Sequence, residues 1–199
     1  MDYLVYFFMC IFLIVGVYQF YFWTQNHPTK EARSLYTPLD DLFSLKPAWV
    51  WIYSGLYYPV IIAVVATVES MREFNYIAMS YFILLFMQMA CFISYPVATP
   101  DTWRKPLKGN GMSERLLMLV HKYDKQDNCF PSMHVSVATL TAMHFMNNAP
   151  VTGNWPLLFP FLIALSALYT RQHYIADLLP GALLGWLAYR LFELMYIPL

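Results

Sequence analysis

The sequence predicts an all-α fold, a polytopic membrane protein with six transmembrane helices in one bundle. Of its 199 residues, 59% are hydrophobic and only 12% are charged, whereas about a quarter of the residues in soluble globular proteins are charged. A soluble fold could not bury this much apolar surface. The apolar residues also gather in six runs that approach the length of about 20 residues needed to cross a bilayer. We expect one domain over residues 1–199, with its functional motifs within about residues 40–190.

The six runs are the predicted transmembrane helices. In chain order they cover residues 3–23, 48–68, 75–95, 131–146, 155–169 and 175–197. The first run has neither the basic start nor the small-residue cleavage site of a signal peptide, and it ends in aromatic residues typical of a membrane interface, so we interpret it as a retained helix. The fourth and fifth runs are short, as expected of helices that begin or end beside a partly polar cavity.

The connections between these helices should alternate between the two sides of the membrane. One side receives residues 24–47, 97–130 and 170–174, which hold ten of the twelve Lys and Arg residues. The other side receives the two termini and residues 69–74 and 147–154. Cytoplasmic loops collect Lys and Arg, but the same cations could attract an anionic substrate. The sequence leaves both explanations open.

Charge and cysteine content exclude two classes. Lys plus Arg and Asp plus Glu number 12 each, so no basic excess indicates nucleic acid as a partner. Cys10 and Cys91 lie inside apolar runs, and Cys129 makes the count odd, so no disulfide framework is expected. The membrane is the partner that the composition does indicate.

A short polar segment at residues 128–134 opens the fourth run. Pro131 is suited to the first helical position, which would leave the backbone N–H groups of Ser132, Met133 and His134 unpaired and directed toward the loops. Such a helix start binds anions, and the Ser132 hydroxyl adds a donor. His134 could protonate a leaving oxygen. The alternative is an ordinary helix start, with Ser132 as its cap and His134 at the interface.

A second polar segment opens the sixth run. His173 and Asp177 are four residues apart, so on one helical face the carboxylate reaches the imidazole. A carboxylate on one ring nitrogen makes the other a better nucleophile or base; the alternative is a buried pair that only joins helices. Arg171 could bind phosphate or anchor at lipid headgroups. Gly181 and Gly185 form a small-xxx-small pair that predicts close helix packing within the chain.

At these residues the chain resembles the type-2 phosphatidic acid phosphatase superfamily of integral-membrane lipid phosphatases and phosphotransferases. The family signature Pro-Ser-Gly-His matches residues 131–134 with Met133 in place of Gly, and Ser-Arg-x5-His-x3-Asp matches Ser166, His173 and Asp177 with Ala167 in place of Arg. The first signature, Lys-x6-Arg-Pro, is absent. The departures resemble the inositol-phosphoceramide-synthase-like branch, through Gln-His-Tyr-x-x-Asp at residues 172–177 and an Asp-x3-Asn-x-Phe-Pro-Ser-x-His pattern at Asp124, Asn128, Phe130, Pro131, Ser132 and His134.

The resemblance implies a role for each site residue. His173 would attack phosphorus and form a phosphohistidine, Asp177 would orient and charge-stabilise it, and His134 would protonate the departing oxygen. Ser132 and the helix start would hold the phosphoryl oxygens. Because two of the three usual cations are missing, we expect other side chains to bind the phosphate, and the candidates are Arg171, Arg104 and Lys105. No metal and no other cofactor is expected.

Three functions follow from this interpretation. The leading one is a phosphatase that hydrolyses a lipid phosphomonoester or pyrophosphate, and the second is a phosphotransferase that moves a phosphoryl or phospho-headgroup to an acceptor hydroxyl. A proton-coupled transporter using the His–Asp pair is the third, and a metal enzyme using His121, His134, His173 and Asp177 is weaker still. The resemblance implies an active site on the extracytoplasmic or luminal side, against the Lys and Arg count, and we follow the resemblance.

Overall fold

The computed structural model describes residues 2–104, 107–124 and 126–197. It is all-α, 75% helical, with no strand in the described part of the chain beyond one isolated bridge between Arg33 and Val97. The α-helices of these residues are α1 (Asp2–Asn26), α2 (Tyr57–Ala63), α3 (Met71–Ser94), α4 (Met112–Tyr123), α5 (Met133–Asn148), α6 (Leu158–Tyr169) and α7 (Ile175–Met195).

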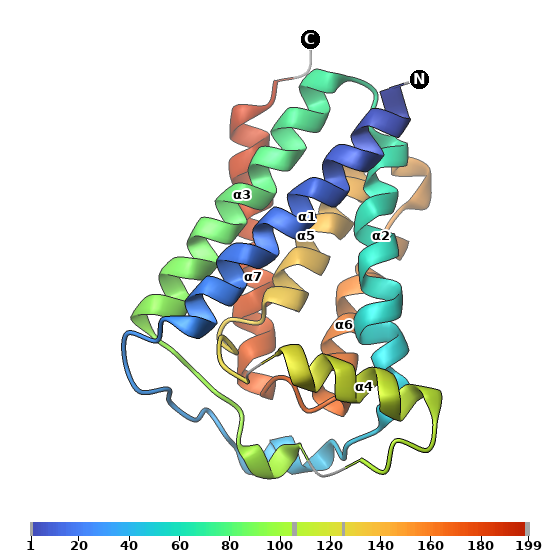
Figure 1. The fold of residues 1–199 in the computed structure, drawn as a ribbon. Coiled ribbons are helices and arrows are strands. Elements are labelled where there is room, and N and C mark those ends of the chain that lie inside the picture. The colour runs from blue at the N-terminus through green and yellow to red at the C-terminus, as the bar shows by residue number, and fades with distance from the viewer. Residues whose placement is uncertain (1, 105–106, 125, 198–199) are drawn as a thin grey trace.

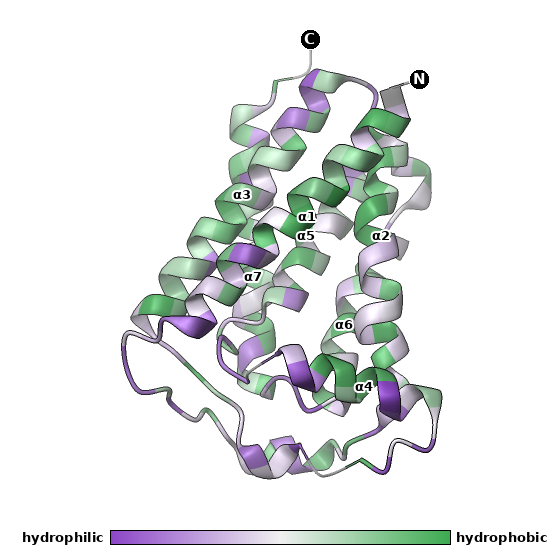
Figure 2. Ribbon diagram, in the orientation of Figure 1, coloured by the Kyte–Doolittle hydropathy of each residue, from purple (hydrophilic) through white to green (hydrophobic). Residues whose placement is uncertain are grey.

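The helices other than α4 run alongside one another as a bundle, with α5 packed against both α6 and α7 (Figure 1). The two chain ends lie together at one end of the bundle, and the long connections after α1 and α3 lie at the other (Figure 1). This arrangement agrees with the predicted alternation of loops. Hydrophilic residues concentrate in the connections, while the middle of the bundle is mostly hydrophobic (Figure 2).

Four helical segments are long and apolar enough to cross a membrane, which indicates an integral membrane protein. They are Tyr3–Asn26, Pro47–Thr67, Met71–Ser94 and Ile175–Met195. The fourth and fifth predicted runs are also helical, but α5 has 16 residues and α6 has 12. Six spans therefore remain a prediction, because these two helices are shorter than a bilayer requires.

The second predicted run is not one regular α-helix. It begins with a 3₁₀ turn at Pro47–Trp49, continues through a π-helical segment at Trp51–Leu56 and α2, and ends in another 3₁₀ turn at Val64–Thr67. A π-helical turn holds more residues than an α-helical turn and often occurs at functional sites. It changes the face of the helix to which the neighbouring side chains point.

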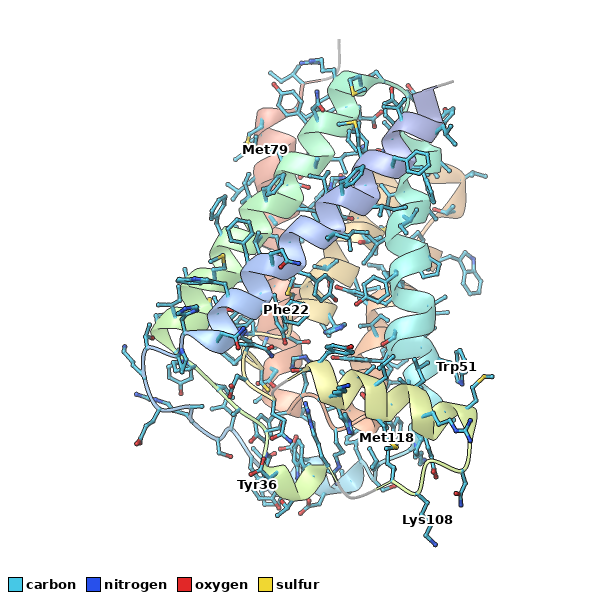
Figure 3. The ribbon with its side chains drawn as sticks, in the orientation of Figure 1. Phe22, Tyr36, Trp51, Met79, Lys108 and Met118 are labelled. Atoms are coloured by element: carbon cyan, nitrogen blue, oxygen red, sulfur yellow. The ribbon has the colours of Figure 1, made fainter. Side chains whose placement is uncertain are left out.

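The sequence did not predict helix α4, which lies across the end of the bundle in the loop expected at residues 97–130 (Figure 1). Leu117 is fully buried, whereas Met118 and Leu119 on the other faces are about half exposed. Met118 is labelled in Figure 3, near the end of the bundle. The indole of Trp51 donates a hydrogen bond to the Ser113 hydroxyl over 3.0 Å and ties α4 to the π-helical segment.

Helices α5 and α7 approach each other closely because glycines face the contact. A Cβ atom on Gly181 would lie 2.6 Å from the carbonyl oxygen of Ser132, and one on Gly185 would overlap the backbone of Ser136. Real Cβ atoms do not come this near to backbone. The prediction that the two glycines serve packing within the chain is confirmed.

We expect Gly181→Ala to destabilise the fold by about 1–3 kcal/mol, the usual cost of overpacking a tight contact. The neighbouring atom is backbone of α5, so it cannot move aside as a flexible side chain would. Gly16→Ala in α1 is the matched control, because a Cβ there meets nothing within 4 Å. Thermal unfolding in detergent measures both. Equal unfolding temperatures for the two variants would contradict the packing assignment.

Candidate functional site

The two polar segments meet at the loop end of the bundle. The backbone N–H of Cys129 donates to the carbonyl of Val97 over 3.0 Å, and the Asn128 amide donates to the Thr24 hydroxyl over 2.8 Å. These bonds hold the segment before α5 against the ends of α1 and α3. The carbonyl of Cys129 then faces His173, which lies in the short connection between α6 and α7.

His173 is the centre of the site. It is 5% exposed, and its Nδ1 lies 2.9 Å from the Cys129 carbonyl oxygen and 3.3 Å from Oδ2 of Asp177. A carbonyl oxygen can only accept a hydrogen bond, so Nδ1 must carry the proton. In the neutral ring the lone pair is then on Nε2. The geometry leaves Nε2 as the nitrogen that can act as nucleophile or base.

Asp177 has two structural roles in addition to its contact with His173. Its Oδ2 accepts a hydrogen bond of 2.9 Å from the backbone N–H of Tyr174, which precedes α7, and this caps the helix. Its backbone carbonyl accepts a 3.0 Å bond from the N–H of Ser132. The side chain is fully buried, and its Oδ1 has no hydrogen-bond partner within the described residues. A hydrogen-bond donor or a cation beside Oδ1 would stabilise the buried carboxylate.

The start of α5 differs from the prediction in two respects. Pro131 is not the first helical residue: the helix begins at Met133 and Ser132 is its cap, with the Ser132 hydroxyl accepting from the N–H of Val135 over 3.4 Å. The N–H of Ser132 is not available to an anion, because it donates to Asp177. His134 lies in the first turn, and its ring centre is 6.1 Å from that of His173. The site thus brings both histidines together.

Arg171, a predicted phosphate ligand, contacts the loop before α2. It has a left-handed backbone, φ 57°, at the end of α6, where its N–H and that of Gln172 cap the carbonyls of Leu168 and Ala167. Its guanidinium donates to the Asp40 carbonyl over 3.0 Å and lies over the Trp103 ring at 4.5 Å. These contacts make it a structural link between the loop before α2 and the start of α7.

Arg104 reaches the connection between α6 and α7. Its guanidinium donates to the Gln172 side chain over 2.9 Å, one residue before His173, and to the carbonyls of His121 and Asp124 at the end of α4. Lys105, the third predicted cation, lies outside the described residues. The contacts of Arg104 therefore link the end of α4 to the residue that directly precedes His173.

Sequence reasoning missed Asp40, a buried carboxylate in the loop before α2. Its Oδ1 accepts from the backbone N–H of Ile175 over 2.8 Å, and its Oδ2 accepts from the N–H of Thr37 over 2.7 Å. Asp40 therefore fixes the first turn of α7 from outside the bundle. The pattern Thr37-Pro-Leu-Asp40 resembles a capping box, and this could have predicted the bond from Thr37 to Asp40. Nothing in the sequence could have predicted the bond from Ile175 to Asp40.

Two titratable groups outside the spanning helices are held neutral. Burial, with the nearby Arg104 cation, lowers the pKa of His121 in α4 to about 4. Burial, with the charges of Asp177 and Asp124, raises the pKa of the Cys129 thiol well above its usual range. Cys129 is therefore a poor nucleophile, because only the thiolate attacks.

One group among the described residues could hold a metal ion. The ligand atoms of Cys129, His173 and Asp177 lie within 4.8 Å of one another, and all three residues are buried. Thiolate, imidazole and carboxylate form a donor set that suits zinc. From the sequence we expect no metal, and that expectation stays a prediction.

The fold and the site define a class of helical membrane protein in which a buried His–Asp pair and a second histidine lie at one mouth of the bundle. A family model described as the PAP2 superfamily matches residues 32–191. The chain belongs to the PAP2 superfamily, whose members are generally phosphatases and phosphotransferases. No curated protein and no solved structure matches the chain.

We expect Asp40→Ala to lower stability by roughly 1–3 kcal/mol, because it leaves the partly buried N–H of Ile175 without its acceptor. Asp41→Ala is the control: Asp41 is exposed, and among the described residues it accepts only from the hydroxyl of Tyr36 in the same loop. Thermal unfolding in detergent compares the two. Hydrogen exchange at the first turn of α7 should rise in the Asp40 variant alone, and unchanged exchange there would refute this role.

Proposed function

We propose that the protein is a membrane lipid phosphatase that hydrolyses a lipid phosphomonoester or pyrophosphate through a phosphohistidine intermediate, without a metal ion. The observation that carries the proposal is the environment of His173. A main-chain carbonyl and Asp177 both face its Nδ1, so Nε2 is presented as nucleophile beside a second histidine. Membership of the PAP2 superfamily supports a phosphatase or phosphotransferase function in general.

The first half of the reaction forms a bond between Nε2 of His173 and phosphorus and breaks the bond from phosphorus to the lipid oxygen. His134 gives its proton to that oxygen as it leaves. Asp177 stabilises the positive charge that the ring gains. In the second half, His134 takes a proton from water, the water oxygen bonds to phosphorus, and the phosphorus–nitrogen bond breaks. Inorganic phosphate leaves and both histidines regain their first states.

The phosphate would be held at the start of α5. The N–H groups of the first turn and a helix dipole of about half an elementary charge attract an anion there, and the Ser132 hydroxyl can donate one more hydrogen bond. Arg104 is our first candidate for the missing cation, because it contacts Gln172 next to His173. Arg171 and Lys105 follow it. Arg104 would exchange its carbonyl acceptors for phosphate oxygens.

A cavity inside the bundle supports a lipid substrate. It lies between α1, α2, α3 and α5, and its lining is almost wholly apolar, including Leu13, Tyr58, Ala78, Gln88 and Met133. Met133 directly precedes His134, so the cavity begins beside the catalytic residues. On α3 the lining extends from Gln88 to Phe74, about 21 Å at the rise of an α-helix. The space has a volume of about 100 Å³, so a hydrocarbon chain with its phosphate at α5 would have to widen it.

The alternative is a phosphotransferase in which an acceptor hydroxyl replaces water in the second half. The resemblance of residues 172–177 to the inositol-phosphoceramide-synthase-like branch favours it. Release of inorganic phosphate, measured with and without a candidate acceptor, separates the two: an acceptor diverts phosphate into product only in a transferase. We also propose that the site faces the extracytoplasmic or luminal side, as the resemblance implies.

Replacing His173 with Ala should abolish turnover while the protein still folds. Acid-labile, base-stable phosphate should be trapped on the wild type and lost with the His173 side chain.

Asp177→Asn should lower kcat by about 10²–10⁴-fold with little change in KM, because the substitution keeps the shape of the side chain and removes its charge. His27→Ala, on an exposed histidine at the end of α1, is the control. Phosphoenzyme on the His173 variant would require a different nucleophile.

Filling the cavity should select against long lipids. Ala78→Phe places a ring in the cavity, and we expect kcat/KM for a long-chain lipid phosphate to fall about tenfold relative to a short-chain analogue, a typical effect of steric change in an apolar pocket. Met79→Phe is the matched control, because Met79 is half exposed on the neighbouring face of α3 (Figure 3). An equal loss for both chain lengths would show that the cavity does not bind the chain.

A further inference from the structure

His134 has an aromatic partner that no motif contains. The hydroxyl oxygen of Tyr53 lies 3.1 Å from Nδ1 of His134, and the two rings stack with their centres 4.2 Å apart. Tyr53 is 2% exposed, so this contact is shielded from water. A buried hydroxyl that bonds to one ring nitrogen fixes the orientation of the imidazole. That nitrogen is then engaged in the hydrogen bond, and the other is left for chemistry.

The π-helical segment Trp51–Leu56 places Tyr53 at this position. Tyr57, four residues later, faces the same histidine from α2, with ring centres 4.8 Å apart. Only the Tyr53 hydroxyl bonds to the imidazole in the described structure. The titratable groups whose rings approach His134 from the surrounding elements are Tyr53, Tyr57 and His173, the last at 6.1 Å.

Proton balance decides which atom donates. An imidazole that releases a proton from Nε2 and later recovers one from water keeps its other proton on Nδ1 throughout. That N–H needs an acceptor in both states, and a neutral hydroxyl oxygen provides one without itself gaining or losing a proton. The opposite tautomer, with the Tyr53 hydroxyl donating to Nδ1, would leave no lone pair on Nε2 to receive the proton from water.

We propose that Tyr53 is a positioning residue for His134: its hydroxyl oxygen accepts the hydrogen bond from Nδ1–H, so that Nε2 is the atom that exchanges the proton with the leaving oxygen and with water. The inference rests on the proposed function for its catalytic meaning. The hydrogen bond itself can be tested without turnover. Tyr53 would thus orient His134 in the way that Asp177 and the Cys129 carbonyl orient His173.

Tyr53→Phe keeps the stacked ring and removes the acceptor. We expect phosphoenzyme formation from an alkyl phosphate to slow by about 10- to 100-fold, because a hydrogen bond to a charged group is lost. An aryl phosphate, whose leaving group needs little protonation, should slow much less. The alkaline limb of the pH–rate profile should move to lower pH, because the protonated imidazole loses the bond that stabilises it.

Tyr57→Phe is the matched control, since it removes another buried hydroxyl beside the same ring without removing a bond to it, and its rates should stay within about threefold of wild type. Equal slowing of alkyl and aryl substrates in Tyr53→Phe, or an unmoved pH profile, would overturn the proposal.

A second measurement separates this inference from the proposed function. In ¹⁵N-histidine NMR spectra of the detergent-solubilised protein, His134 should carry its proton on Nδ1, and it should titrate at lower pH in Tyr53→Phe but not in Tyr57→Phe. A wild-type Nε2–H tautomer, or identical titration in all three proteins, would refute the role of Tyr53. Absence of phosphohistidine in a wild type that passes the NMR test would refute only the proposed reaction.

Discussion

The contact between the first turns of α5 and α7 holds the candidate site together. One main-chain hydrogen bond, from the N–H of Ser132 to the carbonyl of Asp177, joins the two turns, and the absence of a side chain at Gly181 allows their backbones to come this close. The residues around this bond are the ones that carry chemistry. His134 follows Ser132 on one helix, and His173 precedes Asp177 on the other chain segment. A shift of α7 along α5 would separate the two histidines and break the bond at once.

The negative charge at the start of α7 is stabilised by backbone as much as by side chains. Asp177 accepts from the N–H of Tyr174, and Asp40 accepts from the N–H of Ile175. Both carboxylates therefore lie at the positive end of the helix dipole. The neighbouring His173 has two acceptors on one nitrogen, the Cys129 carbonyl and Asp177. Without such partners, a buried carboxylate would cost several kcal/mol.

Properties that depend on local sequence were predictable here. Each of the six apolar runs contains helix, and the paired glycines pack closely. His173 and Asp177 are in contact as predicted, but not on one helical face, because α7 begins at Ile175, after His173. Properties that depend on contacts between distant parts of the chain were not predictable. Helix α4 was missed because its 12 residues are too short for a search for spans. The contacts of Arg171 were not predictable either, because nothing in the sequence places the Asp40 carbonyl and the Trp103 ring beside it.

The nearest acceptor to the imidazole of His173 is a peptide oxygen, that of Cys129. The identity of residue 129 does not determine this contact, since every amino acid supplies the same main-chain carbonyl. A scan of side chains would therefore find the aspartate and overlook the shorter of the two bonds. The path of the loop, set by its bonds to Val97 and Thr24, is what evolution would have to preserve there. Insertions or deletions in this loop are consequently more dangerous to the protein than substitutions.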